Sequence, residues 1–156
     1  SGRSHLLRVL HALVSAAPGN GTDFRHALRQ STAHIRRKGL TIVLSDFMDD
    51  AEPIARTLSR LRFEGSDVIA MGVFDPMERS LDFSSITRFH DLEDNQILVV
   101  DPQLIQNAYQ REFDAHQQEI RQACHRYGFE YTALPVGDDY DVALGAYLRH
   151  RMERFT

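Results

Sequence analysis

The segment from Leu40 to Asp46 reads Leu-Thr-Ile-Val-Leu-Ser-Asp, a largely apolar run followed by an acid. A short run of this kind, preceded by Gly39 and followed by polar residues, predicts a strand of a parallel sheet that is buried on both faces. Open α/β sheets bind ligands in the crevice outside the carboxyl ends of their strands. The strand is therefore expected to deliver Asp46 to the ligand side of a sheet.

A second polar segment opens a helix shortly before this strand. Residues 20–28 read Asn-Gly-Thr-Asp-Phe-Arg-His-Ala-Leu, with Thr22 in the turn that begins the helix. Hydroxyl and carboxylate oxygens suit hard cations, and Mg²⁺ takes about six oxygens, several of them from water. Thr22 and Asp46 together predict part of a site for Mg²⁺ or Mn²⁺. The alternative is structural, with Thr22 as a helix N-cap and Asp46 bracing the turn after the strand.

Helices and strands alternate along the rest of the chain. Helices are predicted over residues 4–16, 23–38, between Asp50 and Gly65, and over 102–127 and 138–151, with further strands over 67–74 and 129–133. Residues 86–92 and 96–100 predict a β-hairpin that extends from the main sheet. The alternation favours an α/β fold with an open, mainly parallel sheet and helices on both faces. At 156 residues the chain is expected to form a single domain over residues 1–156.

Apolar periodicity predicts which faces of the last two helices are buried. In the helix over 102–127 the expected inward residues are Ile105, Ala108, Tyr109, Phe113, Ile120 and Cys124. In the terminal helix they are Val142, Leu144, Tyr147 and Leu148.

Three further acids lie near the expected carboxyl edge of the sheet. Asp49 and Asp50 either orient metal-bound water or, in the structural alternative, one caps the next helix while the other is solvated. Asp75 follows the strand over 67–74, but Asp75-Pro76 is equally a pair that begins a turn. Both interpretations stay open for each of these acids.

Composition excludes several classes of function. A net charge of −4 gives no general attraction for nucleic acid or for an anionic membrane surface. No apolar run is long enough to span a membrane, and the single cysteine, Cys124, is expected in the core. The eight histidines form no zinc motif, and His116 is expected to be packed and hydrogen-bonded. No motif nominates a nucleophile with its base, which argues against an enzyme.

Several segments together resemble von Willebrand factor A-type domains, in particular the bacterial family called domain of unknown function 58. They are Thr22, Asp46, residues 37–40 (Arg-Lys-Gly-Leu), the strand over 67–74 with Asp75-Pro76 after it, and Val100-Asp101-Pro102. The resemblance implies a Rossmann-like fold with a metal-ion-dependent adhesion site built from three loops. Thr22 and Asp46 match two of these loops.

The third loop of that site, Asp-x-Ser-x-Ser, occurs nowhere in the 156 residues. We therefore expect the chain to be a piece of a longer protein that begins after the central strand of the fold, and to bind metal weakly or not at all by itself. The absent strand would lie beside the strand from Leu40 to Ser45. The fragment is accordingly expected to self-associate through the exposed edge from Leu40 to Asp46.

The resemblance also implies a function. A cation held by Thr22, Asp46 and the missing loop would leave one position open for a carboxylate of another protein. The expected function is a cytoplasmic adaptor, alone or as the cytoplasmic domain of a membrane-anchored protein, that works with a MoxR-type AAA+ ATPase in the assembly or maturation of other proteins. The rival is a metal-dependent phosphoester hydrolase that uses Asp46, Asp49 and Asp75.

Overall fold

The computed structural model describes residues 2–16, 26–28, 30, 38–91, 96–137 and 140–153. Its elements are α1 (Gly2–Ser15), β1 (Leu40–Ser45), α3 (Ala51–Phe63), β2 (Asp67–Phe74), α4 (Pro76–Ser80), β3 (Thr87–His90), β4 (Ile97–Val100), α5 (Pro102–Arg126), β5 (Glu130–Pro135) and α6 (Tyr140–Glu153). Most of the helix predicted over 23–38 lies outside the described residues.

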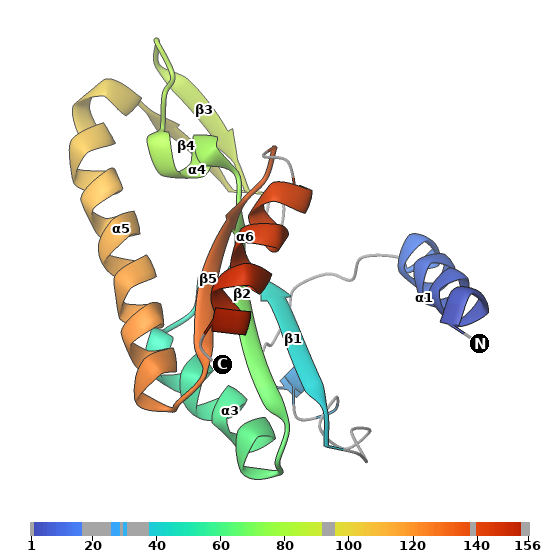
Figure 1. The fold of residues 1–156 in the computed structure, drawn as a ribbon. Coiled ribbons are helices and arrows are strands. Elements are labelled where there is room, and N and C mark those ends of the chain that lie inside the picture. The colour runs from blue at the N-terminus through green and yellow to red at the C-terminus, as the bar shows by residue number, and fades with distance from the viewer. Residues whose placement is uncertain are drawn as a thin grey trace.

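The main sheet has the order β1-β2-β5, and all of its strands are parallel. Leu40 of β1 lies opposite Asp67 of β2, and Ile69 of β2 lies opposite Glu130 of β5. The open, parallel α/β fold predicted from the alternation of elements is therefore confirmed. Figure 1 shows β2 in the middle of the sheet and β1 at its edge.

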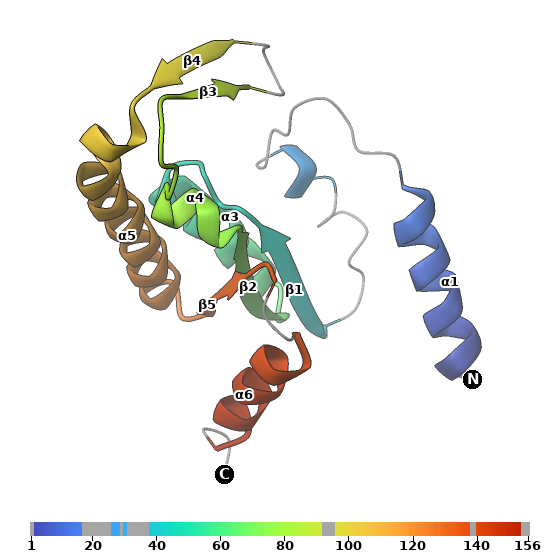
Figure 2. The same ribbon diagram turned by 90° about the horizontal axis from the view of Figure 1, so that it is seen from above.

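Helices cover both faces of this sheet. Seen from above, α3 and α5 lie on one side and α6 on the other (Figure 2). The main core lies on the first side, where Ile54, Leu58 and Leu61 of α3 meet Val68 of β2 and Ile120 of α5. Burying an aliphatic side chain of this size contributes about 1.5–3 kcal/mol, so this layer holds β1, β2 and β5 to the helices.

Strand β1 is not buried on both faces, contrary to the expectation from its sequence. Val43 packs against the core, but Leu40, Ile42 and Leu44 on the opposite face are 56%, 46% and 64% exposed. The reason is position, because β1 is an edge strand in the described sheet and α6 lies over β2 and β5. An apolar run alone does not reveal which strand of a sheet will be at the edge.

The hairpin pairs as predicted, since β3 and β4 are antiparallel with Thr87 opposite Val100. Strands β3 and β4 form a two-stranded sheet separate from β1-β2-β5. The first half of α5 rises beside this hairpin, above the main sheet (Figure 1). Ile105 and Ala108 are therefore exposed, whereas Phe113, Ile120 and Cys124 further along α5 are buried as predicted.

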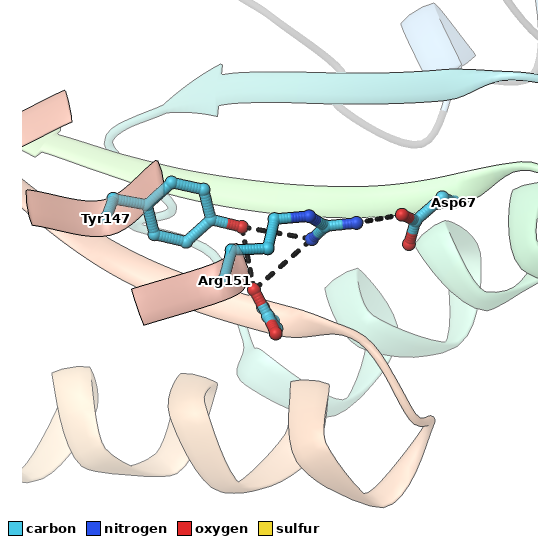
Figure 3. Close-up of polar contacts among 4 residues, drawn as sticks. Asp67, Tyr147 and Arg151 are labelled. Atoms are coloured by element: carbon cyan, nitrogen blue, oxygen red, sulfur yellow. Dashed lines mark hydrogen bonds and ion pairs between the residues drawn. The ribbon is translucent and has the colours of Figure 1, made fainter. Parts of the chain in front are cut away.

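Helix α6 contacts the sheet through polar residues. Tyr147 Oη donates to Glu130 Oε2 at 2.7 Å, and the guanidinium of Arg151 donates to Glu130 Oε2 at 3.3 Å and to Asp67 (Figure 3). Arg151 is mostly buried in this contact. Leu144 and Leu148, predicted to face inward, are instead substantially exposed, and the side chain of Val142 lies outside the described residues.

The first helix, α1, stands apart from the sheet in both views, and none of its residues is buried (Figures 1 and 2). Its apolar residues, Leu6, Leu7, Val9, Leu10, Leu13 and Val14, are all exposed. Across the described part of the chain, no helix combines the length and the apolarity that crossing a lipid bilayer requires.

Candidate functional site

The turn after β1 is built around Phe47. Its backbone adopts the left-handed region with φ 54°, which is uncommon for a residue other than glycine, and its side chain is 1% exposed. The ring packs edge-to-face on Tyr131, with centroids 5.9 Å apart. The Nε2 atom of His116 on α5 lies 2.8 Å from the carbonyl oxygen of Phe47, in a hydrogen bond that ties the turn to that helix. The prediction that His116 is hydrogen-bonded is confirmed.

Asp46 lies in this turn with its side chain exposed, at the carboxyl end of β1. Its Oδ1 atom accepts from Ser45 Oγ at 3.3 Å and from the backbone N–H of Met48 at 3.4 Å. Ser45 Oγ in turn accepts from the backbone N–H of Phe47 at 3.2 Å. Asp46 thus braces the turn, as in the structural alternative, and also presents a carboxylate at the edge where ligands bind in open α/β sheets.

Asp75 follows the neighbouring strand β2, and its role in the structure is that of a helix cap. Its Oδ1 atom accepts from the backbone N–H of Met77 at 2.8 Å, and Pro76 occupies the first turn of α4. The turn-initiating interpretation of Asp75-Pro76 is therefore confirmed. This carboxylate satisfies a backbone donor at the start of α4 through its Oδ1 atom, which gives Asp75 a structural role.

Asp49 and Asp50 are both exposed in the segment that leads into α3. Asp50 occupies the N-cap position of α3, but its side chain makes no capping hydrogen bond; its carbonyl oxygen accepts from Ile54 N at 3.3 Å. Asp50 therefore holds the expected N-cap position, but the expected cap by its side chain is not formed. Both residues are exposed in the segment that follows Asp46.

Thr22, the predicted partner of Asp46, lies outside the described residues. Within the residues that the structure describes, no group of three or more His, Cys, Asp and Glu side chains is arranged to hold a metal ion. An exposed carboxylate fits one ligand position of an oxygen-preferring cation, but the described residues do not make a complete site. Asp46 is thus the one predicted metal ligand whose position is described.

Cys124 is fully buried in the core between α5 and the sheet. Burial raises the pKa of its thiol to about 12, because the thiolate would lose its hydration. The sulfur is therefore protonated at neutral pH and unreactive. The prediction that Cys124 is a core residue is confirmed.

The sequence pointed to Asp46 but not to Phe47, and it predicted a hydrogen bond for His116 without indicating that its partner is the carbonyl oxygen of Phe47. Phe47 follows an acid and precedes Met48, a pattern with no glycine or asparagine to indicate a left-handed backbone. The one local indication that this turn is anchored in the core was an apolar side chain, Phe47, between a predicted strand and a predicted helix. The contact from His116 joins residues far apart in the chain and leaves no local pattern.

The fold and this turn define a class, an open parallel α/β domain with an acidic turn at the carboxyl end of its edge strand. The chain belongs to the DUF58 family, because the family model described as "Protein of unknown function DUF58" matches residues 1–120. No curated protein and no solved structure matched the chain. The wider likeness to von Willebrand factor A-type domains stays a prediction from the motifs.

Proposed function

We propose that this chain is a protein-interaction module, not an enzyme, and that its partner docks at Asp46. The observation that carries the proposal is the conformation of Phe47, a buried, left-handed residue that turns inward while Asp46 is exposed. Such a backbone costs on the order of 1 kcal/mol, and strained residues of this kind cluster at binding and catalytic sites. The contacts of Phe47 with Tyr131 and His116 offset that cost and fix the position of Asp46.

In this proposal Asp46 supplies one oxygen ligand for Mg²⁺ or Mn²⁺, and Thr22 supplies another. Because these ions take about six oxygens, two protein ligands leave positions for water and for the carboxylate of a partner protein. Asp49, Asp50 and Asp75 would at most orient bound water. We expect the chain alone to bind the cation weakly, since a full site needs a further serine-bearing loop.

The proposed partner is a MoxR-type AAA+ ATPase, and the proposed location is the cytoplasm. The support for this partner is the resemblance to the family, of which the chain is a member. The exposed edge from Leu40 to Asp46 supports a second kind of contact, self-association of the chain, because β1 pairs with one strand only within the described residues.

Two measurements test the cation part of the proposal. Calorimetry with Mg²⁺ and with Mn²⁺ is expected to show no site tighter than the micromolar range. A tighter constant that Thr22→Ala removes would contradict the incomplete site. Asp82→Asn, a change at an exposed acid outside the proposed site, is the matched control.

Binding to a purified ATPase of this class, immobilised and probed with the full chain, tests the docking point. Asp46→Asn is expected to abolish the Mg²⁺-dependent part of the binding, whereas Asp82→Asn, a change at another exposed acid, is expected to leave it intact. Equal binding by the wild type and by Asp46→Asn would overturn the role of Asp46. Magnesium-dependent phosphatase turnover that Asp46→Ala abolishes would establish the rival hydrolase.

A further inference from the structure

The outer face of α3 joins two arginines and an aromatic ring. The helix buries its other face against the core, through Ile54, Ala55, Leu58, Ser59 and Leu61. Arg56, Arg60 and Phe63 stand at spacing i, i+4, i+7, which places them on one side of a helix, opposite the buried residues. All three are exposed, and the side chain of Phe63 is 88% exposed. We refer to these three residues as the basic face of α3.

The charges of the basic face are not neutralised by the acid closest to it in sequence. Glu52 is the single acid of α3, and it accepts from Arg126 Nη2 at 2.5 Å and from Tyr127 Oη at 2.7 Å. The pKa of Glu52 is lowered by the hydrogen bond from Tyr127 and by Arg126, and to a smaller degree by the charge of Arg56. Within the part of the chain that the structure describes, the side chains of Arg56 and Arg60 make no ion pair or hydrogen bond.

Helix stability does not account for this face. Arg60 lies in the last turn of α3, where a cation complements the helix dipole, but Arg56 lies one turn earlier. Like charges at i, i+4 destabilise a helix, so the pair of arginines weakens α3 in isolation. Phe63 buries almost none of its ring and therefore adds little to the core. These residues cost stability in the free chain, which points to a contact with another molecule.

We propose that the basic face of α3 is a docking surface for a carboxylate-rich segment of another protein. A guanidinium binds a carboxylate through two parallel hydrogen bonds, and arginine and aromatic residues are enriched at the centres of protein interfaces. The partner segment is an amphipathic helix whose acids meet Arg56 and Arg60 and whose apolar side chain covers Phe63. Helices are commonly recognised through anchors at this i, i+4, i+7 spacing.

The number of charges favours a protein partner over a nucleic acid or a membrane. Recognition of an anionic membrane by charge takes a cluster of about four to eight basic residues. The basic face supplies two unpaired arginines, and the net charge of −4 opposes the approach of any extended polyanion. A short acidic segment needs only a few carboxylates to match the two arginines.

The basic face is separate from the Asp46 turn. Helix α3 has 13 residues and is therefore about 20 Å long. It runs antiparallel to β1 and ends at the lower end of the sheet (Figure 1), whereas Asp46 follows the carboxyl end of β1. Two partners can therefore be bound at once. This surface needs no cation, so the proposal goes beyond the docking function of Asp46 and is tested independently of it.

Fluorescence anisotropy with the full chain in EDTA tests the charge recognition. The probe is a labelled helical peptide of about 15 residues that carries Glu at positions i and i+4 and Leu at position i+7. We expect this peptide to bind, and to bind more weakly as salt is added. A matched peptide with Gln in place of each Glu is expected to bind at least about tenfold more weakly.

Variants of the chain locate the contact. The double change Arg56→Gln and Arg60→Gln is expected to weaken binding of the Glu peptide by at least about tenfold, and Phe63→Ser is expected to weaken it as well. Arg149→Gln, at an exposed position of α6, is the matched control and is expected to bind like the wild type. A chain with Arg56→Glu and Arg60→Glu is expected to bind a Lys version of the peptide better than the wild type does. A misfolded variant would not show this gain.

Each contrary outcome overturns a stated part of the proposal. Absence of binding, or equal binding of the Glu and Gln peptides, would remove the acidic segment as the occupant. An equal loss in Arg149→Gln would show a general effect of charge. Tighter binding of a DNA duplex or of phosphatidylserine vesicles, lost in the double Gln variant, would assign the face to a nucleic acid or to a membrane. Asp46→Asn is expected to bind the peptide like the wild type, and a loss there would contradict the separation of the two surfaces.

Discussion

Strand β2 lies between two strands and between two layers of helices, whereas its parallel neighbour β1 has one strand partner in the described sheet and one covered face. The two strands are similarly apolar, yet Ile69 of β2 is 1% exposed and Ile42, directly opposite it in β1, is 46% exposed. Position in the sheet, and not local composition, decides the burial of each residue. The open side of β1 is thus the part of the molecule where further contacts can form.

The two faces of β1 are expected to respond very differently to a charge. Val43→Asp would place a carboxylate against the core, at a cost on the order of several kcal/mol, which is comparable to the stability of a whole domain. We expect this variant to be unfolded or aggregated. Leu44→Asp on the exposed face is expected to melt cooperatively near the wild-type temperature in dilute solution. A soluble, cooperatively folded Val43→Asp variant would mean that β1 faces the core differently.

Truncating the side chains of two opposed residues, Ile69 of β2 and Ile42 of β1, tests the same contrast in burial. Ile69→Ala is expected to lower the free energy of unfolding by about 2–5 kcal/mol, because it leaves a cavity beneath a buried position. Ile42→Ala, in the facing position of β1, is expected to change it by less than about 0.5 kcal/mol. Denaturant unfolding at low chain concentration, where self-association does not contribute, measures both. Equal losses in the two variants would contradict the exposed position of Ile42.

The sequence predicted the bounds of β1 and β2 because each is an apolar run between polar or glycine-containing turns. It did not predict α4, because that helix has five residues and its opening pair, Asp75-Pro76, resembles a simple turn. The prediction that Ile105 and Leu148 face the core was wrong, and the physical reason is the same for both residues. Apolar periodicity shows which helix face can be buried, but only the tertiary arrangement shows whether another element reaches it.

For the candidate site, the sequence predicted an acid at the carboxyl end of a strand, and the structure describes Asp46 there. The chain order also places Asp75 after the next strand, but its capping contact with Met77 follows from the local turn. The left-handed conformation of Phe47 is held by Tyr131 and His116, which are distant in sequence. Contacts of this kind cannot be derived from local patterns.

Arg151 joins α6 to both β2 and β5, so this residue tests why β2 and β1 differ. Arg151→Ala removes the contacts with Asp67 and Glu130 and leaves both acids near the sheet without their cation. We expect a loss of about 1–2 kcal/mol in the free energy of unfolding, reduced by the partial exposure of Asp67. The backbone amides of α6 should also exchange with solvent faster in Arg151→Ala than in the wild type. Arg149→Ala, at an exposed position of the same helix, is the control and should have little effect.

Residue-resolved hydrogen exchange in β1, measured at two chain concentrations, tests the central claim that this strand is an open edge. The amides of Thr41, Val43 and Ser45 point at β2 and are expected to be protected at both concentrations. The amides of Leu40, Ile42 and Leu44 are expected to exchange rapidly in dilute solution and to become protected as the concentration rises. Protection of these three amides at high dilution would show that another segment of the same chain covers the edge, and rapid exchange at every concentration would show that no second strand pairs with it.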